Sequence, residues 1–306
     1  MPGFIDPKVD FAFKRVFGSP EHPRITIHFL NCVLQPPRPI TWVEILNPIQ
    51  DRDFDDAKLA ILDVLAQDAE DRRYNIEMQT TLPVELPSRL TFYNCLHYVR
   101  QLPSGSPYHH LRPAISICVL DRRLFREVPD YHLSFRLRCD QRDLVFTDDL
   151  VFHTLELPKY KASDHNRESL PPLEKWLYFL QRAEYLEADE LAEQLVDAEF
   201  REAAGVLEMI SQSPEDRQFY EARMKFLHDE EARLIAARIE GREEGREAGL
   251  EAGREEGREE GRVVGKIQML QEILGDSVAD DTDLLALDLG QLSQQLSELQ
   301  SRLRKR

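Results

Sequence analysis

The chain has 306 residues, a formal net charge of -17 and 42% hydrophobic residues, which is enough for a buried core and is typical of about two domains. A uniformly acidic surface repels nucleic acid, so a nucleic-acid function requires an uneven distribution of this charge. Residues 1–160 hold 19 basic and 22 acidic side chains, whereas the remaining residues hold 20 and 34. The acidity therefore belongs to the second half of the chain.

Membrane and disulfide classes are also disfavoured. No stretch approaches the roughly 18 consecutive apolar residues of a membrane span, and the first residues lack the apolar run of a signal peptide. We therefore expect a cytoplasmic protein without a membrane partner. The four cysteines are widely spaced and form no CxxC pair, which predicts reduced packing residues instead of a zinc or redox site.

Helical and extended patterns alternate along the first 160 residues. Apolar spacing predicts helices over 9–17, 25–34 and 85–102. Extended runs predict strands over 40–46, 59–67, 74–80, 114–120, 131–138 and 151–157. The polar run 68–73 predicts a hairpin between the second and third of these strands, and the continuous apolar run 114–120 is typical of a strand covered on both faces. From Leu173 onward the pattern is helical, so the sequence predicts an α/β fold followed by a mostly helical region.

A repeat then places seven of the 13 glycines at every fourth position from Gly241 to Gly265. Each helical glycine costs about 1 kcal/mol relative to alanine, and glutamates four residues apart repel each other. Glu–Arg pairs three residues apart return only about 0.2–0.5 kcal/mol each, so a stable isolated helix is not expected. Two interpretations remain open, a solvated low-complexity spacer and a helix that packs its glycine face against a partner.

The C-terminal residues carry a short leucine pattern. Spacings of four and three alternate, giving a heptad seam of fewer than three repeats. The leucines are Leu285, Leu289, Leu292, Leu296, Leu299 and Leu303. This seam predicts a homo-oligomer formed through the C-terminal helices.

The residues with the strongest chemical signal lie on the predicted hairpin. Alternation puts Asp63 on an otherwise apolar face of one strand, and puts Glu77 and Gln79 together on one face of the next. If the hairpin brings Asp63 beside Glu77, their repulsion is relieved by a hard divalent cation such as Mg2+. Such an ion activates water and polarises a phosphodiester, and Gln79 would orient that water or a phosphate oxygen. Exposed strand acids without a metal are the alternative that these residues alone leave open.

The spacing from Asp63 to Glu77-x-Gln79 resembles the PD-(D/E)XK nuclease signature, in a variant with glutamine at the lysine position. The chain as a whole resembles the recombination-promoting nuclease family of PD-(D/E)XK nuclease family transposases. The pieces that carry the resemblance occur in the expected order across residues 1–160. They are the segments at 6–18, 58–63, 75–79, 101–108, 111–113 and 156–159.

The resemblance implies a restriction-endonuclease-like core, a mixed central sheet flanked by helices, and metal-dependent cleavage of DNA in recombination or transposition. It implies Asp63 and Glu77 as catalytic metal ligands for Mg2+, or for Mn2+ or Ca2+, with Gln79 in the lysine position and Asp10 as an accessory catalytic acid. DNA contacts are implied for Lys14, Lys58 and Arg89. For Asp10, Lys14 and Arg89 the alternatives are a helix-dipole acid, a solvated lysine and a brace for the sheet, respectively.

These expectations define four regions and two functions. The regions are a nuclease-like domain (1–160), a helical region (161–238), the glycine repeat (239–266) and a C-terminal helix with the leucine seam (267–306). Because glutamine carries no positive charge for the developing phosphorane, we expect slow nicking unless Lys58 or a second metal replaces the lysine. The alternative function is a catalytically weak nuclease-fold module that binds DNA or another protein.

Overall fold

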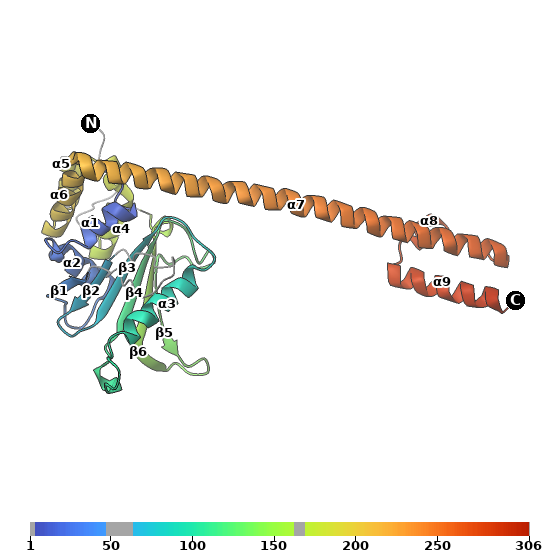
Figure 1. Cartoon of the computed structure of the whole chain (residues 1–306), viewed down its shortest axis with the longest axis horizontal. Coiled ribbons are helices and arrows are strands. Elements are labelled where there is room, and N and C mark those ends of the chain that lie inside the picture. The colour runs from blue at the N-terminus through green and yellow to red at the C-terminus, as the bar shows by residue number, and fades with distance from the viewer. Residues whose placement is uncertain (1–3, 47–63, 162–168, 306) are drawn as a thin grey trace. The chain divides into compact units, whose positions relative to one another are not determined.

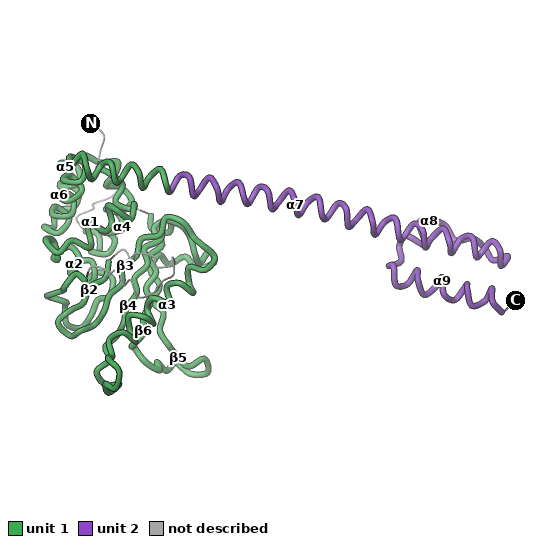
Figure 2. The backbone as a smooth tube through the Cα atoms, viewed as in Figure 1, with its two compact units in different colours: residues 1–226 green, residues 227–306 purple. Residues whose placement is uncertain are grey.

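The computed structural model describes residues 4–46, 64–161 and 169–305. It divides into two compact units, residues 1–226 and residues 227–306 (Figure 2). Within the described residues no helix is both long and apolar enough to cross a membrane. Of the four cysteines, Cys32 and Cys118 are buried, whereas Cys95 and Cys139 are partly exposed.

A six-stranded mixed sheet forms the centre of the first unit (Figure 1). The strand order is β1-β2-β3-β4-β6-β5, in which β3, β4 and β6 run parallel and the other neighbours pair antiparallel. The strands are β1 (Val43–Leu46), β2 (Val64–Asp68), β3 (Arg73–Gln79), β4 (Ala114–Leu120), β5 (His132–Arg138) and β6 (Val145–Glu156). The predicted α/β fold with a mixed sheet is therefore confirmed.

The two faces of β3 face different cores because side chains alternate along a strand. Tyr74, Ile76 and Met78 belong to the main hydrophobic cluster, which also contains the buried residues of α1 (Asp10–Phe17), α2 (Pro23–Leu34) and α4 (Pro172–Arg182). Asn75, Glu77 and Gln79 point to the opposite face. That face is covered by α3 (Leu86–Val99), whose buried leucines pack on β4.

The remaining helices of the first unit complete the main core. Trp176 of α4 is fully buried and its ring lies 5.2 Å from that of Phe17 and 4.4 Å from that of Phe200. The further helical elements are α5 (Ala188–Gln194), α6 (Ala198–Gln212), and the short 3-10 turns η1 (Tyr108–His110), η2 (Leu157–Lys159) and η4 (Ala183–Tyr185). Long-range aromatic packing therefore joins the helical region after residue 160 to the predicted nuclease core.

The glycine repeat is helical. α7 (Pro214–Leu274) continues through all seven glycines, and a Cβ built on any of them would meet no other atom within 4 Å. The structure therefore continues as a helix through the repeat, and no described atom packs against its glycine positions. The glutamate, arginine and alanine residues between the glycines have high helix propensity.

The second unit contains α7 from Leu227 onward together with α8 (Asp281–Leu284) and α9 (Leu289–Arg304). Leu292 and Leu299 of the predicted seam are buried against Val264 and Ile267 of α7. Leu285 and Leu303, by contrast, are 57% and 39% exposed. The central part of the seam therefore packs within one chain, and the predicted homo-oligomer stays a prediction.

Candidate active site

The predicted hairpin is present and its register is regular. β2 and β3 pair antiparallel, with Val64 opposite Ile76 and Leu65 opposite Asn75. Leu65 therefore shares a face with Asn75, Glu77 and Gln79. Two of the sequence-predicted site residues, Asp63 and Lys58, lie outside the described residues.

Glu77 is a buried carboxyl group on the face covered by α3, with only 4% of the residue exposed. Its Oε1 accepts a hydrogen bond of 2.7 Å from Asn75 Nδ2. Burial raises the pKa of Glu77, although the Asn75 bond and the nearby Arg89 charge oppose this. Among the described residues Oε2 receives only long contacts, 3.4 Å from Gln79 Nε2 and 3.9 Å from Arg89 Nη2, so it retains capacity for a further ligand.

Gln79 is held by a cation from the neighbouring helix. Arg89 Nη2 donates a hydrogen bond of 2.7 Å to Gln79 Oε1. Arg89 stands near the start of α3, where the buried leucines Leu86 and Leu90 on either side fix the orientation of the helix on β4. The structure therefore brings together Glu77, Gln79 and Arg89, three of the residues predicted from the sequence.

Asn75 is a further site residue, beyond those predicted from the sequence. It is 2% exposed and its Oδ1 is buried without a partner among the described residues, as is Ser116 Oγ opposite it on β4. The signal was available, because Asn75 lies two residues before Glu77 and alternation places both on one face. What the sequence could not give is the bond between the two side chains.

Asp10 and Lys14 lie on α1, which packs on the other face of β3. Asp10 Oδ1 accepts a hydrogen bond of 2.7 Å from Arg223 Nε in α7. The carboxylate of Asp10 is therefore engaged in an ion pair with Arg223, on the side of the sheet away from Glu77. Gly18 follows α1 and lies close to both Lys14 and the start of β2. A Cβ built on Gly18 would be 3.6 Å from Lys14 Cγ and 3.1 Å from Val64 Cγ2.

The described donors suit a hard divalent cation but do not complete a site. Carboxylate and amide oxygens, such as Glu77 Oε2 and Asn75 Oδ1, are the ligands that Mg2+ and Ca2+ prefer. Across the described residues no group of three or more His, Cys, Asp or Glu side chains is placed to hold a metal. The predicted second carboxylate, Asp63, directly precedes Val64 in sequence and lies outside the described residues.

Comparison with curated proteins and with solved structures gives no match to this chain. The family described as PD-(D/E)XK nuclease family transposase matches residues 7–237, which is most of the chain. The match extends beyond the sheet into the first part of α7. The mixed sheet, the hairpin that bears Glu77 and Gln79, and this match together show that the chain belongs to the PD-(D/E)XK nuclease family of transposases.

Proposed function

We propose that the protein is a cytoplasmic, divalent-metal-dependent DNA endonuclease that acts in recombination or transposition. The observation that carries the proposal is the arrangement of Glu77, Gln79 and Arg89, a buried carboxylate beside an amide that is bonded to a cation. Membership of a nuclease family supplies the reaction class, hydrolysis of a phosphodiester.

Asp63 is proposed as the second metal ligand. It directly precedes Val64, which pairs with Ile76, so one further step of the same antiparallel register would set Asp63 opposite Glu77. A bound Mg2+ or Mn2+ would supply a water of lowered pKa and a Lewis acid for the phosphodiester. The chain itself contributes the two carboxylates, and the Asn75 bond that holds Glu77 in position.

Arg89 is proposed to supply the positive charge that Gln79 lacks. Its guanidinium contacts Gln79 directly and lies 3.9 Å from Glu77 Oε2, so it would face a phosphate bound to the same carboxylate. A charged donor fixed in advance stabilises charge that develops in a transition state. This assignment makes Arg89 both a DNA contact and a substitute for the lysine, and it does not need Lys58 for the latter role.

Lys14 and Lys58 are proposed as further phosphate contacts. For Lys14 the support is its place in the family-like segment at 6–18 and its position on α1, whose core residues pack on β3. An accessory role for Asp10 would require release of its bond to Arg223. We therefore propose Glu77, Gln79 and Asp63 as the principal catalytic residues and Asp10 as a residue recruited on DNA binding.

The test is nicking of supercoiled plasmid with Mg2+, Mn2+ or Ca2+ by the full chain and by Asp63→Ala and Glu77→Ala. The proposal predicts metal-dependent nicking by the wild type and loss in both variants. Equal nicking by all three proteins would refute it.

A second candidate function is a DNA-binding or protein-interaction module with little catalysis. The uncharged Gln79 and the predominance of acidic residues after residue 160 favour it. Titration calorimetry with Mn2+ separates the two functions. A heat of Mn2+ binding that is present in the wild type and lost in Glu77→Ala supports the nuclease. Absence of any Mn2+ heat in the wild type supports the module.

Self-association through the C-terminal helices is proposed as well. With Leu292 and Leu299 buried inside one chain, the surface available to a second copy includes Met269 and Leu285, which are 62% and 57% exposed. Light scattering of the wild type and Met269→Glu tests this, and a monomeric wild type would contradict it.

A further inference from the structure

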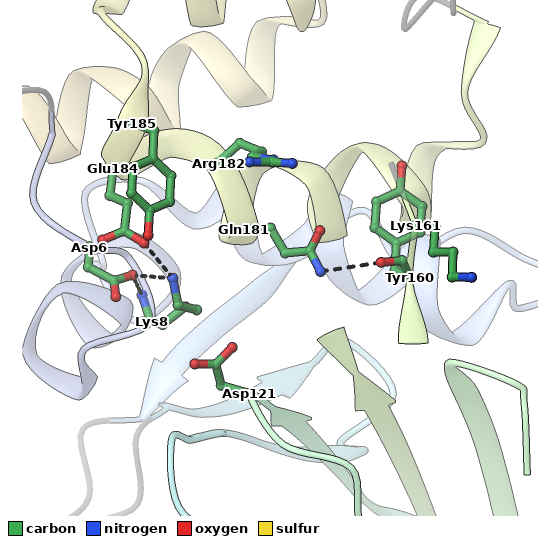
Figure 3. A pocket seen from close by; sticks show the side chains of 9 residues that line it. All are labelled: Asp6, Lys8, Asp121, Tyr160, Lys161, Gln181, Arg182, Glu184 and Tyr185. Carbon is green, nitrogen blue, oxygen red and sulfur yellow. Dashed lines mark hydrogen bonds and ion pairs between the residues drawn. The ribbon is translucent and has the colours of Figure 1, made fainter. Parts of the chain in front are cut away.

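A cavity of about 630 Å3 lies where the parallel strands of the sheet end (Figure 3). Asp121 directly follows β4, and Tyr160 and Lys161 follow η2 after β6. The opposite wall comes from the loop before α1 and from the end of α4 with η4. Open α/β sheets form ligand sites outside the carboxyl ends of parallel strands, so this cavity has the expected place for one.

The cavity is joined to the catalytic strand through the backbone. The Asp121 N–H donates a hydrogen bond of 2.9 Å to the carbonyl oxygen of Gln79. Asp121 therefore stands beside the last residue of β3, two residues after Glu77. A ligand in the cavity would lie at the same end of the sheet as the proposed scissile phosphate.

One side of the cavity is built around a buried lysine. Lys8 Nζ lies 2.9 Å from Asp6 Oδ1 and 3.0 Å from Glu184 Oε1, and its side chain is only 10% exposed. Burial lowers the pKa of Lys8, but the two carboxylates outweigh this effect and raise it overall. The ammonium group is therefore charged and its two acids are held in place.

The other charged groups are available to a ligand. Within the described part of the chain, no ion pair or side-chain hydrogen bond engages Asp121, Lys161 or Arg182. Figure 3 shows the Asp121 carboxylate pointing into the space between Lys8 and Gln181, with Lys161 on the side away from Lys8. Burial raises the pKa of Asp121, because the nearby positive charges do not fully offset the loss of water around its carboxyl group.

The lining argues against a simple ion. Its three acids, Asp6, Asp121 and Glu184, balance its three bases, Lys8, Lys161 and Arg182, so neither a bare anion nor a bare cation is favoured by charge. No set of three acids or other ligands is placed to hold a metal in the described ranges 4–46, 64–161 and 169–305. A ligand with its own anionic end and a separate hydrogen-bonding end fits better.

We propose that this cavity binds one nucleotide of the DNA strand next to the scissile phosphate, an inference that rests on the proposed nuclease function. Arg182 and Lys161 would bind its phosphate, and Asp121 would accept a hydrogen bond from an exocyclic amino group of its base. Tyr185, 70% exposed at the rim, offers a ring for stacking. Thymine has no exocyclic amino group, so the pocket favours cytosine, adenine or guanine over thymine.

The experiment measures binding of dCMP, dTMP and inorganic phosphate to the metal-free full chain by nuclear magnetic resonance shifts or calorimetry. The wild type should bind dCMP more tightly than dTMP, and both more tightly than phosphate. Arg182→Gln should weaken dCMP binding about tenfold or more, and Asp121→Asn should remove the preference over dTMP. Arg142→Gln, an exposed arginine outside the cavity, is the matched control and should change nothing.

Equal binding of phosphate and dCMP, or dCMP binding that is insensitive to both cavity substitutions, would overturn the proposal. Binding of free dCMP and of a short single strand that contains it should also be compared. Equal affinities would overturn the proposal, because the site would then serve free nucleotides. These readouts use no metal and no cleavage, so loss of nicking in the plasmid assay leaves them unaffected. The two proposals can therefore fail separately.

Discussion

Arg89 on α3 donates a hydrogen bond of 2.7 Å to the side-chain oxygen of Gln79 on β3. The same guanidinium nitrogen lies 3.9 Å from Glu77 Oε2, and Arg89 is only one-third exposed. One cation is thus shared by both strand residues that the family pattern singles out. The site combines the neutral Gln79 with a positive charge from the next element along the chain.

Loss of the Arg89 charge should slow cleavage more than it weakens folding. Arg89→Gln removes a charge-assisted hydrogen bond and leaves Gln79 Oε1 without its donor, so nicking should fall about tenfold or more. Adding Gln79→Lys to this variant restores a cation at the lysine position and should recover activity. Single-turnover nicking measures both effects, and wild-type rates for Arg89→Gln would contradict the assignment.

Glu77 should make the fold less stable as pH rises. Its folded-state pKa is raised by burial, so the folded chain holds this proton more tightly than the unfolded chain. Stability is then greatest below the unfolded pKa of about 4.3 and is lost as pH rises through the folded pKa. Glu77→Gln should therefore be more stable than the wild type at pH 8 and differ little at pH 4, as measured by urea unfolding. A wild type that is the more stable protein at pH 8 would contradict this.

Asn75 is predicted to be a positioning residue for Glu77. Asn75→Ala removes the 2.7 Å donor to Oε1, which raises the Glu77 pKa further and shifts Mn2+ binding to higher pH. Asn75→Asp places a second negative charge beside Glu77 and should shift Mn2+ binding to a still higher pH. Calorimetric Mn2+ affinity from pH 6 to 8.5 is the measurement. Parallel pH profiles for both variants and the wild type would show that Asn75 has only a packing role.

Sequence patterns predicted the parts of the fold where one face or both faces are uniformly apolar. The strand 114–120 was located with its observed bounds because all seven of its residues are buried. The first half of β6 was missed because Asp148 and Asp149 interrupt an exposed stretch that forms a strand only by pairing with β5. Pairing between distant strands is a tertiary effect that local propensity does not contain.

The site shows the same division. Alternation along β3 was sufficient to place Glu77 and Gln79 on one face. The Arg89 contact depends on how α3 packs through Leu86 and Leu90, which no spacing rule describes. The leucine seam likewise defined an apolar face, and the packing of Leu292 and Leu299 on the end of α7 could not be read from their spacing.

The intrachain use of the leucine seam predicts a local effect of substitution in α9. Leu292 is fully buried against α7, so Leu292→Ala should cost the second unit about 2–5 kcal/mol. Leu285→Ala, at a 57% exposed position, is the control and should cost less than about 0.5 kcal/mol. Hydrogen exchange across α9 reports the difference. Equal protection in the two variants would contradict the packing described.

A histidine pair should contribute to acid sensitivity. His132 Nε2 and His153 Nδ1 lie 2.9 Å apart, and burial lowers the pKa of His132 and lowers that of His153 to about 4. Because the folded pKa lies below the unfolded value of about 6.5, stability is present above pH 6.5 and is lost as pH falls toward 4. His153→Asn should reduce this loss by about 2–3 kcal/mol between pH 7 and 4 in urea unfolding. An unchanged pH dependence would contradict the role of the pair.

Metal-dependent cleavage at Glu77 is tested most directly by single-turnover nicking of supercoiled plasmid with Mn2+, comparing the wild type with Glu77→Gln. Glutamine keeps the shape of the buried side chain and removes its charge, so a folding defect is not expected to confuse the result. Nicking by the wild type should require Mn2+ and should fall at least about a hundredfold in Glu77→Gln. Equal Mn2+-dependent rates in the two proteins would contradict it.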